Sequence, residues 1–255
     1  MTGNSGFIVA GVALLLAACS GSGQAQAPAP AGGRQIVLYR PSTSTFYVRH
    51  GDGTQAATEL PFGAPGDVPL WADFAGNGRR VPAVYRKGGL WLISTHADGK
   101  ADATLNFGGQ PGDVPLAADL DGDGRADLVI FRGGEWLVRG TRNPAVTLIF
   151  HFGTAGDVPL LADVNGDGKV DLVLFRAGQW LASTHRDDKA DVTFAFGGVA
   201  GERPLAVDWE GDGSVALVLF RDGNWLVSGK HDGKVSTELA FGMKGDAPIA
   251  VWLQK

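Results

Sequence analysis

Cysteine is almost absent from this sequence, with one, Cys19, among 255 residues. A lone cysteine excludes an intramolecular disulfide, so the fold must be held together by packing or by a bound metal. No apolar run reaches the roughly 20 residues that a membrane-spanning helix needs, and no segment shows a sustained helical period. Positive charge is not in excess either, since the net charge is −5. This balance argues against a nucleic-acid partner, which a basic face would bind.

The N-terminus differs in composition from the rest of the chain. Residues 7–18 are small and apolar, too few to span a membrane but typical of the core of a signal peptide. They end Leu16-Ala17-Ala18-Cys19, which resembles the lipobox of bacterial lipoproteins. The resemblance implies that residues 1–18 are a signal peptide and that Cys19 carries a lipid anchor. An ordinary cleaved signal is the alternative, and the lack of Lys and Arg in residues 1–18 favours it.

The residues after the cysteine predict a linker. Residues 20–33 are Gly, Ser, Gln, Ala and Pro only, so residues 19–34 are expected to form a flexible tether. Ser20 follows the cysteine, which by resemblance to lipoprotein sorting rules implies the outer membrane. The sequence therefore predicts an exported bacterial outer-membrane lipoprotein that faces the periplasm or the cell surface.

Glycine is abundant, with 39 residues, and most of it belongs to a repeat. One cassette returns every 44 to 46 residues: Phe-Gly, Gly-Asp-Val-Pro-Leu, Ala-Asp, Asp-Gly-Asp-Gly, Asp-Leu-Val-Leu-Phe-Arg and Trp-Leu. Five copies fill residues 35–255 and leave no room for a second domain. Three landmarks mark the copies: Phe62, Phe107, Phe152, Phe196 and Phe241; Gly66, Gly112, Gly156, Gly201 and Gly245; Arg40, Arg86, Arg132, Arg176 and Arg221.

Each copy predicts four short strands separated by Gly, Asp and Pro. Strands such as residues 172–175 are apolar at every position, which indicates that neighbouring sheets cover both faces. Four-stranded sheets stacked radially form a β-propeller. In the second full copy the expected strands are residues 114–118, 128–131, 135–138 and 146–150.

The phase of the repeat predicts how the ring closes. The chain enters the cassette in the middle, at residues 36–40, and leaves it after residues 248–252, so the two ends complete one another. Pairing the ends would also hide strand edges that invite aggregation. We expect an all-β fold, a five-bladed β-propeller of four-stranded blades, closed by pairing of the N- and C-terminal strands.

The cassette resembles a known repeat. Phe-Gly, Gly-Asp-Val-Pro and the run from Ala118 to Arg132 are similar to the FG-GAP/VCBS repeat family, which is related to the calcium-bearing propeller of integrin α chains. The resemblance covers residues 35–255 and implies calcium-binding loops. The repeat here is shorter, and five copies replace seven blades, so ligand surfaces of integrins are not carried over. Repeat number and length are also similar to those of five-bladed lectins.

Two loops carry oxygen ligands at the spacing of a calcium site. A carboxylate or carbonyl at positions 1, 3, 5, 7 and 9, with Gly at position 6, directs oxygen atoms to one point, and hard oxygen ligands suit Ca²⁺. An EF-hand is excluded because position 12 is Ile130 or Leu174 in place of Glu. Asx turns without metal are the alternative. The ligand sets are Asp119, Asp121, Asp123, the carbonyl of Arg125 and Asp127, then Asp163, Asn165, Asp167, the carbonyl of Lys169 and Asp171.

The remaining loops are degraded. A third, weaker site is formed by Asp208, Glu210, Asp212 and the carbonyl of Ser214, because Ala216 replaces the ligand at position 9. The loop of the first full copy keeps Asp73 and Asn77 but has lost two ligands, and no metal is expected there. We therefore expect two Ca²⁺ ions and an incomplete third site. Two ions would change the formal charge from −5 to −1, because each adds +2.

Two further series recur with the repeat. Each copy pairs an acid with one of the five arginines, which we interpret as an ion pair closing blade against blade, with five equivalent ligand pockets as the alternative. Each copy also places an aromatic ring at one position of the third strand, expected to be buried between sheets, with sugar stacking as the alternative. The acids are Asp67, Asp113, Asp157, Glu202 and Asp246; the rings are Phe46, Trp91, Trp136, Trp180 and Trp225.

Residues that depart from the repeat are better candidates for a specific function than residues that recur in every copy. Trp71 replaces a small residue on an inner strand, Trp209 enters a calcium-type loop, and His151 interrupts an outer strand. Arg79 and Arg80 add a local basic spot. These positions are candidates for a ligand surface.

Together these features predict a binding module and no enzyme. We expect a monomeric, calcium-stabilised, lipid-anchored propeller that contacts a protein or a glycan at the cell surface, as in adhesion or envelope assembly. The alternative is a lectin-like propeller with repeated pockets. A glycosidase is less favoured, because it needs two carboxylates placed asymmetrically about the substrate, whereas the acids here follow the repeat.

Overall fold

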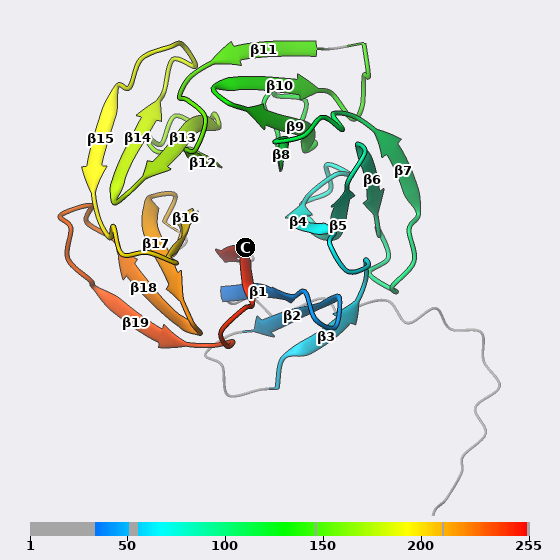
Figure 1. Ribbon diagram of the computed structural model, residues 1–255, viewed down its shortest axis with the longest axis horizontal. Helices are drawn as coiled ribbons and strands as arrows, with labels where there is room; N and C mark the ends of the chain where they lie inside the picture. The colour runs from blue at the N-terminus through cyan, green and yellow to red at the C-terminus, as the bar shows by residue number, and fades with distance from the viewer. Residues whose placement is uncertain (1–33, 51–55, 146, 211, 254–255) are drawn as a thin grey trace, which may run out of the picture.

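The computed structural model describes residues 34–50, 56–145, 147–210 and 212–253. Within these ranges the chain forms 20 strands, grouped in five four-stranded antiparallel sheets around a central axis (Figure 1). No helix in the described ranges is long and apolar enough to cross a membrane. The signal peptide predicted at residues 1–18 and the tether up to residue 33, with Cys19, lie outside the described residues. The predicted five-bladed β-propeller is confirmed.

Each blade is a run of neighbouring strands, ordered from the centre of the ring outwards. The strands expected near residues 114, 128, 135 and 146 are confirmed as β8 to β11, with ends that differ by at most one residue. The blades are β4 Val68–Ala72, β5 Val81–Arg86, β6 Leu90–Ile93 and β7 Ala103–Asn106; β8 Val114–Ala118, β9 Asp127–Arg132, β10 Glu135–Arg139 and β11 Thr147–His151; β12 Val158–Ala162, β13 Asp171–Arg176, β14 Gln179–Ser183 and β15 Val192–Ala195; β16 Arg203–Asp208, β17 Val215–Arg221, β18 Asn224–Ser228 and β19 Thr237–Ala240.

The fifth blade joins the two ends of the chain. Its strand order is β20-β1-β2-β3, formed by Ala247–Leu253, Arg34–Arg40, Thr45–His50 and Thr58–Pro61. β20 and β1 are antiparallel, and the C-terminal strand lies at the centre of the ring beside β1 (Figure 1). The register shifts once, between Val37 and Leu38. Closure of the ring by the terminal strands, predicted from the phase of the repeat, is confirmed.

The core lies between neighbouring blades. The second strand of a blade is buried at successive positions, as in β9, where Leu128 and Ile130 are at most 1% exposed. Both residues pack against Tyr85 and Trp91 of the preceding blade. The third strand alternates buried and partly buried residues, as in β6 and β10, and the outermost strands alternate partly buried and exposed residues. This arrangement explains the continuous apolar runs in the sequence, because each inner sheet is covered on both faces.

The Phe-Gly pair fixes the outer strand to the rest of its blade. The amide of Phe107 donates to the carbonyl of Gly89 (2.8 Å), and Nε1 of Trp91 donates to the carbonyl of Phe107 (3.0 Å). Gly108 has φ +78°, and a Cβ there would lie 2.9 Å from Oδ2 of Asp113. A side chain at this position would therefore be strained, which accounts for the recurring glycine.

The five recurring rings are core residues. Phe46, Trp91, Trp136, Trp180 and Trp225 are all 0% exposed. The four indole groups among them donate to the carbonyl of the Phe-Gly phenylalanine at 2.9–3.0 Å. The prediction that these rings are buried between sheets is confirmed. These rings cannot stack on a sugar without opening the core. The alternative of repeated sugar-binding pockets built on them is therefore not supported.

Candidate functional site

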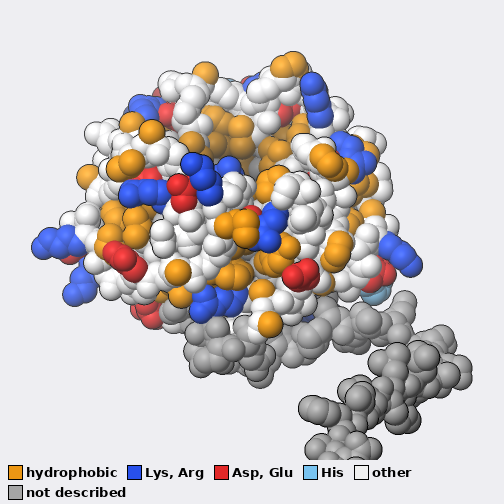
Figure 2. Space-filling view, turned by 60° about the horizontal axis from the view of Figure 1, so that its bottom comes forward, with side chains coloured by type: hydrophobic (Ala, Val, Ile, Leu, Met, Phe, Trp, Pro, Cys, Tyr) orange, Lys and Arg blue, Asp and Glu red, His pale blue; other side chains and the backbone are white. Residues whose placement is uncertain are grey.

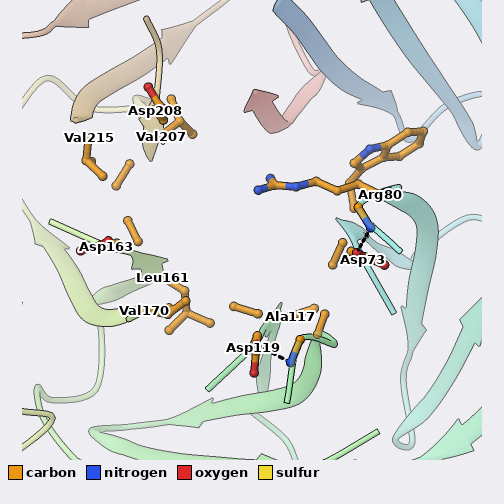
Figure 3. Close-up of a pocket in the computed structure, with 18 of the residues that line it drawn as sticks. Asp73, Arg80, Ala117, Asp119, Leu161, Asp163, Val170, Val207, Asp208 and Val215 are labelled. Carbon is orange, nitrogen blue, oxygen red and sulfur yellow. Dashed lines mark hydrogen bonds between the residues drawn. The ribbon is translucent and has the colours of Figure 1, made fainter. Parts of the chain in front are cut away.

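The candidate ligand loops all lie at one end of the central opening. Each loop joins the inner strand of a blade to the second strand, as residues 119–127 do between β8 and β9 and residues 163–171 between β12 and β13. The first acid of each loop lines a cavity of about 770 Å³ in the opening. Figure 3 shows Asp73, Asp119, Asp163 and Asp208 on different sides of this space.

The first loop, residues 119–127, is shaped by its own carboxylates. Oδ1 of Asp119 accepts from the amide of Gly122 (2.7 Å), and Oδ2 accepts from the amide of Gly124 (2.8 Å). Both glycines have positive φ, 81° and 87°, which the tight turn requires. Oδ1 of Asp123 accepts from the amide of Arg125 (2.9 Å). The chain is thus wound around the side chain at position 1, so that positions 3 and 9 approach it.

Asp127, at position 9, is a buried carboxylate with one unsatisfied oxygen. The residue is 0% exposed, and Oδ2 accepts from the amides of Leu120 (2.9 Å) and Asp121 (3.1 Å). Oδ1 has no hydrogen-bond partner. Burial, together with the charges of Asp121 and Asp119, raises the pKa of Asp127 to about 6. Oxygen atoms of Asp119, Asp121 and Asp127 lie within 4.8 Å of one another.

The second loop, residues 163–171, repeats the arrangement with one fewer charge. Asp171 is also 0% exposed; its Oδ2 accepts from the amide of Val164 (2.8 Å), whereas Oδ1 has no hydrogen-bond partner. Burial and the charges of Asp163 and Asp167 raise the pKa of Asp171. Asn165 replaces the acid at position 3, and its Nδ2 donates to Oδ2 of Asp167 (3.1 Å). Because an amide stands at position 3, three carboxylates do not converge here as they do in the first loop.

Both loops fit a hard divalent cation. A buried polar atom without a partner is costly, and here the same oxygen recurs in two loops that already gather carboxylates. A cation among these oxygens would satisfy Oδ1 and remove the repulsion that raises the pKa values. The donors are carboxylate, amide and carbonyl oxygens, the set that Ca²⁺ prefers. The residues able to hold it are Asp119, Asp121, Asp123, Asp127 and the carbonyl of Arg125, and in the second loop Asp163, Asn165, Asp167, Asp171 and the carbonyl of Lys169.

The other loops lack the acid at position 9. In the loop that starts at Asp208, position 9 is Ala216, which is 4% exposed and lies in an apolar cluster. Asp212 accepts from the amide of Ser214 (2.8 Å), so the turn forms without that acid. In the remaining loop Asp73 accepts from four backbone amides, those of residues 75–78. Position 9 there is Val81, and the loop is closed by hydrogen bonds alone.

A residue that the sequence did not single out links the two complete loops. Nη1 of Arg186 donates to the carbonyl of Leu120 (2.8 Å), and its Nε donates to the carbonyl of Val170 (2.8 Å). Arg186 lies in the turn between β14 and β15 with φ +55°. Thr141 and His231 each donate to the corresponding carbonyl in their own blades, those of Ala126 and Val215. The residue type varies between copies, so the repeat gave no signal for this contact.

The acid–arginine pairs lie within blades. Nε of Arg132 donates to Oδ1 of Asp113 (2.7 Å); Asp113 directly precedes β8, and Arg132 ends β9 of the same sheet. The prediction that the pair closes blade against blade is therefore wrong. Asp113 also accepts from the amides of Gly109 and Gln110, in the loop arriving from the preceding blade. The other pairs are Arg40–Asp246, Arg86–Asp67, Arg176–Asp157 and Arg221–Glu202.

Electrostatics agree with a structural role for these pairs. Burial raises the pKa of Asp113, but hydrogen bonds from Arg132, Gln110 and Gly109 outweigh it and leave the pKa below its ordinary value. The acid side chains are 1–2% exposed in all five pairs. A ligand could not reach these carboxylates, so they do not form five equivalent pockets.

The three residues proposed as a ligand surface do not come together. Trp71, on inner strand β4, is partly buried and lines the central opening. His151 is exposed at the end of outer strand β11. Trp209 is 1% exposed and packs in the core with Leu38, so its assignment to a surface is wrong. Position 2 of a loop points into the core in other blades as well, as Leu120 does at 3% exposure.

No protein-family model matches this chain, and no curated protein matches it either. Solved structures with a similar fold include an Agrocybe aegerita lectin described as specifically recognising non-reducing terminal N-acetylglucosamine, at 18% identity and a TM-score of 0.46, over 88% of this chain and 71% of that chain. Two structures of BBS1N in complex with ARL6DN match over 81% of this chain. The one soaked with lead has 13% identity and a TM-score of 0.42 over 64% of that chain. The one soaked with mercury has 14% identity and a TM-score of 0.42 over 76% of that chain.

Proposed function

We propose that this protein is a calcium-stabilised binding module, exported and anchored by a lipid on Cys19, that presents its propeller to a protein or glycan partner at the bacterial cell envelope. The proposal follows the FG-GAP/VCBS resemblance in placing Ca²⁺ in the loops that begin at Asp119 and Asp163. A third, weaker site at Asp208, Glu210, Asp212 and Ser214 belongs to the same proposal.

One observation supports the metal most strongly. Asp127 and Asp171 are both fully buried at position 9 of their loops, and in each of them Oδ1 lacks a hydrogen-bond partner. Two loops 44 residues apart in the chain therefore have the same unsatisfied oxygen, at the position where the ligand spacing calls for one. Loops that lack this acid carry an apolar residue in its place and no orphaned oxygen there.

The proposed role of the ion is structural. Each loop joins the end of an inner strand to the start of the second strand of the same blade, so an ion bound there would tie these two strands together. A ligand that binds only the folded state stabilises it by RT ln(1 + [L]/Kd), about 2.7 kcal/mol at 100 times Kd. Without disulfides, that contribution is a large share of the stability of a domain of this size.

Calorimetric titration of Ca²⁺ into chelator-treated protein tests the metal sites. We expect about two ions per chain, and loss of binding in Asp121→Ala combined with Asn165→Ala. Asp188→Ala, at an exposed acid outside the loops, is the matched control and should titrate like the wild type. Absence of binding at millimolar Ca²⁺ would refute the metal assignment.

The anchor is tested separately. Wild-type protein expressed in a bacterium should incorporate labelled palmitate and fractionate with the outer membrane, whereas Cys19→Ala should do neither. Equal membrane association of both proteins would remove the lipid anchor from the proposal and leave the calcium sites unaffected.

Binding is proposed over catalysis because the acids in the described residues serve the scaffold. The five acids paired with arginine are buried, and the loop acids accept backbone amides. The repeated-pocket lectin is a poorer alternative, because its aromatic rings are 0% exposed. On the face in Figure 2, the described Lys and Arg side chains are interspersed with Asp and Glu, which gives no support to a nucleic-acid partner.

A further inference from the structure

The mouth of the central opening that lies opposite the ligand loops carries exposed apolar residues. Val68, Val114 and Val158 begin the inner strands β4, β8 and β12, whereas the ligand loops follow the ends of those strands. Val199 and Met243 lie in the turns that lead into β16 and β20 at the same mouth. These five residues, here called the apolar ring, are 38–56% exposed and include five of the seven exposed large hydrophobic residues in the described ranges.

Each of the five blades contributes one residue to the apolar ring, although from two different positions. In three blades it is the first residue of the inner strand. The two blades with Arg203 or Ala247 at that position carry the apolar residue in the preceding turn, as Val199 and Met243. The other three blades have Ala64, Gln110 and Thr154 at that place in the turn. Neither the strand nor the turn therefore requires a large apolar residue, which favours a role for the ring itself.

An apolar recess of about 190 Å³ lies on the axis just inside this mouth. Pro69, Pro115 and Pro248 line it, each directly after the first residue of its strand, and apolar side chains of the inner strands form the rest of its wall. No charged residue of the part of the chain that the structure describes lines this recess. Its volume is below the roughly 300–1,000 Å³ usual for small-molecule sites, so it suits one apolar side chain better than a whole small molecule.

The accessible charge around the apolar ring is mainly positive. Lys87 in the turn after β5, Arg203 at the start of β16 and Lys244 beside Met243 are exposed, and none of them has an ion-pair partner among the described residues. The acids of the five arginine pairs at this mouth are only 1–2% exposed. The remaining described acids on this face are Asp222 and the partly buried Glu135. Carboxylates of a partner would therefore be attracted to the three unpaired cations.

The chain leaves the ring of blades at the opposite mouth. Arg34, the first described residue, pairs with Leu253 near the end of β20, the end at which the inner strands of the other blades lead into the ligand loops. Under the proposed function only 14 residues, 20–33, separate Arg34 from the lipid on Cys19. The anchor would hold the mouth with the ligand loops nearest the membrane. The apolar ring would then be directed away from the bilayer, where its partner is a protein.

We propose that the apolar ring docks a partner protein, which inserts one aromatic or aliphatic side chain into the recess and places carboxylates near Lys87, Arg203 and Lys244. This inference rests on the proposed binding function and specifies a protein as the partner and the face that it contacts. Protein interfaces combine a well-packed apolar centre with a polar rim, and a few residues buried near the centre carry most of the binding energy. The recess and the cations around it have this arrangement.

The repeat supplies variants of the apolar ring that should fold. Val68→Ala, Val114→Ala and Val158→Ala each copy Ala247, which begins β20. Combined in one chain, they remove three of the five apolar side chains of the ring. Val235→Ala is the matched control, because Val235 is 42% exposed but lies in the turn between β18 and β19, at the mouth with the ligand loops.

A second variant tests the cations. Lys87→Glu combined with Lys244→Glu reverses two exposed charges beside the apolar ring. Lys189→Glu is the control, because Lys189 is equally exposed but lies in the turn between β14 and β15, at the other mouth.

Photo-cross-linking in the bacterium that produces the protein identifies the partner. With p-benzoylphenylalanine in place of Val114 in the full-length chain, we expect one protein adduct, whose cross-linked peptide contains an aromatic or aliphatic residue flanked by Asp or Glu. The same probe in place of Val235 should not give that adduct. The proposal is overturned by the absence of an adduct at position 114, by an adduct with a lipid, a glycan or a second copy of this chain, or by the same adduct from both positions.

Calorimetric titration of the partner identified in this way into full-length protein with Ca²⁺ measures the contribution of the ring and of the cations. We expect the triple alanine variant and the double glutamate variant each to bind at least tenfold more weakly than the wild type, with both control variants unchanged. Wild-type affinity in the triple variant would refute docking on the apolar ring. Wild-type affinity in the glutamate variant would refute the contact with carboxylates.

The calcium dependence of melting, measured on the same samples, separates this inference from the proposed function. Protein that Ca²⁺ stabilises but that gives no protein adduct at the apolar ring would contradict only the docking face. Protein that is indifferent to Ca²⁺ would contradict the calcium sites, whichever partner it binds.

Discussion

The guanidinium of Arg186 bridges to Leu120, 66 residues away in the chain, through a 2.8 Å hydrogen bond from Nη1 to the carbonyl of Leu120. Its Nε donates to the carbonyl of Val170 in the same blade as Arg186, whereas Leu120 belongs to the preceding blade. Leu120 and Val170 each belong to one of the two loops proposed to bind calcium. One side chain therefore fixes the positions of the two loops relative to each other. A conformational change in either loop would alter a hydrogen bond of Arg186 and so affect the other loop.

Arg186→Ala should weaken both loops together. The variant loses two hydrogen bonds from a charged donor, each worth about 1.5–3 kcal/mol when buried and less at this partly exposed site. We expect a loss of roughly 1–3 kcal/mol in the free energy of unfolding and lower affinity at both calcium sites in a calorimetric titration. Lys189→Ala, an exposed residue of the same turn, should change neither. Loss of affinity at only one site would contradict the coupling.

Substitution of Trp136 tests whether the recurring ring serves core packing or ligand binding. Its ring is 0% exposed and lies 5.0 Å from Phe131, and its Nε1 donates to the carbonyl of Phe152 (2.9 Å). Trp136→Ala should lower the free energy of unfolding by about 3–5 kcal/mol in urea denaturation. Trp136→Phe keeps an aromatic ring but loses the hydrogen bond, so its cost should be clearly smaller. A fully stable alanine variant would show that the ring does not carry core packing.

Closure of the ring by the chain ends is testable by truncation. Removal of residues 251–255 deletes the partners of Arg34, Gln35 and Ile36 in the pairing of β20 with β1. We expect a melting temperature many degrees lower and a strong tendency to aggregate, because edges of two strands become exposed. Removal of residues 20–33, which lie outside the described residues, is the control. Equal tolerance of both deletions would contradict closure by the terminal strands.

The metal-free protein should lose stability as the pH rises. Burial and the charges of Asp121 and Asp119 raise the pKa of Asp127 to about 6 in the folded state, against about 3.9 in the unfolded chain. A carboxyl with a raised folded pKa stabilises fully below the unfolded pKa, and that contribution is lost as the pH rises through 6. The loss for Asp127 is about 3 kcal/mol, from two pKa units.

Urea denaturation in chelator between pH 4 and pH 7.5 measures this effect. Asp127→Asn does not titrate, so its free energy of unfolding should change less over the same interval. Parallel pH profiles for the variant and the wild type would show that Asp127 is not desolvated in the way that its burial implies.

The fold could be predicted almost entirely from the sequence, because several different features of the repeat each indicated the same architecture. The apolar run of β13 required covered faces, and the turn glycines required positive φ. The phase of the repeat placed β20 beside β1. A strand boundary that is ambiguous in one copy of the repeat is clear in another, which is why the boundaries predicted at residues 114–118 were also correct.

The site was only partly predictable, for physical reasons. Ligand spacing identified Asp127 and Asp171, but their burial and the orphaned oxygens depend on packing between blades. Trp209 was misassigned because a loop position that points into the core looks the same in sequence as one that points outward. Arg186 was missed because it joins carbonyl groups, and backbone acceptors leave no signature in the residue type.

The most direct test of the central claim is a comparison of melting temperatures for the wild type and the Asp127→Asn, Asp171→Asn double variant, each in chelator and in millimolar Ca²⁺. If the two buried carboxylates exist to hold calcium, their charges cost stability in its absence, so the variant should melt higher than the wild type in chelator. In Ca²⁺ the order should reverse, with the wild type several degrees higher. A wild type that melts at the same temperature in both buffers, with no reversal, would contradict the account.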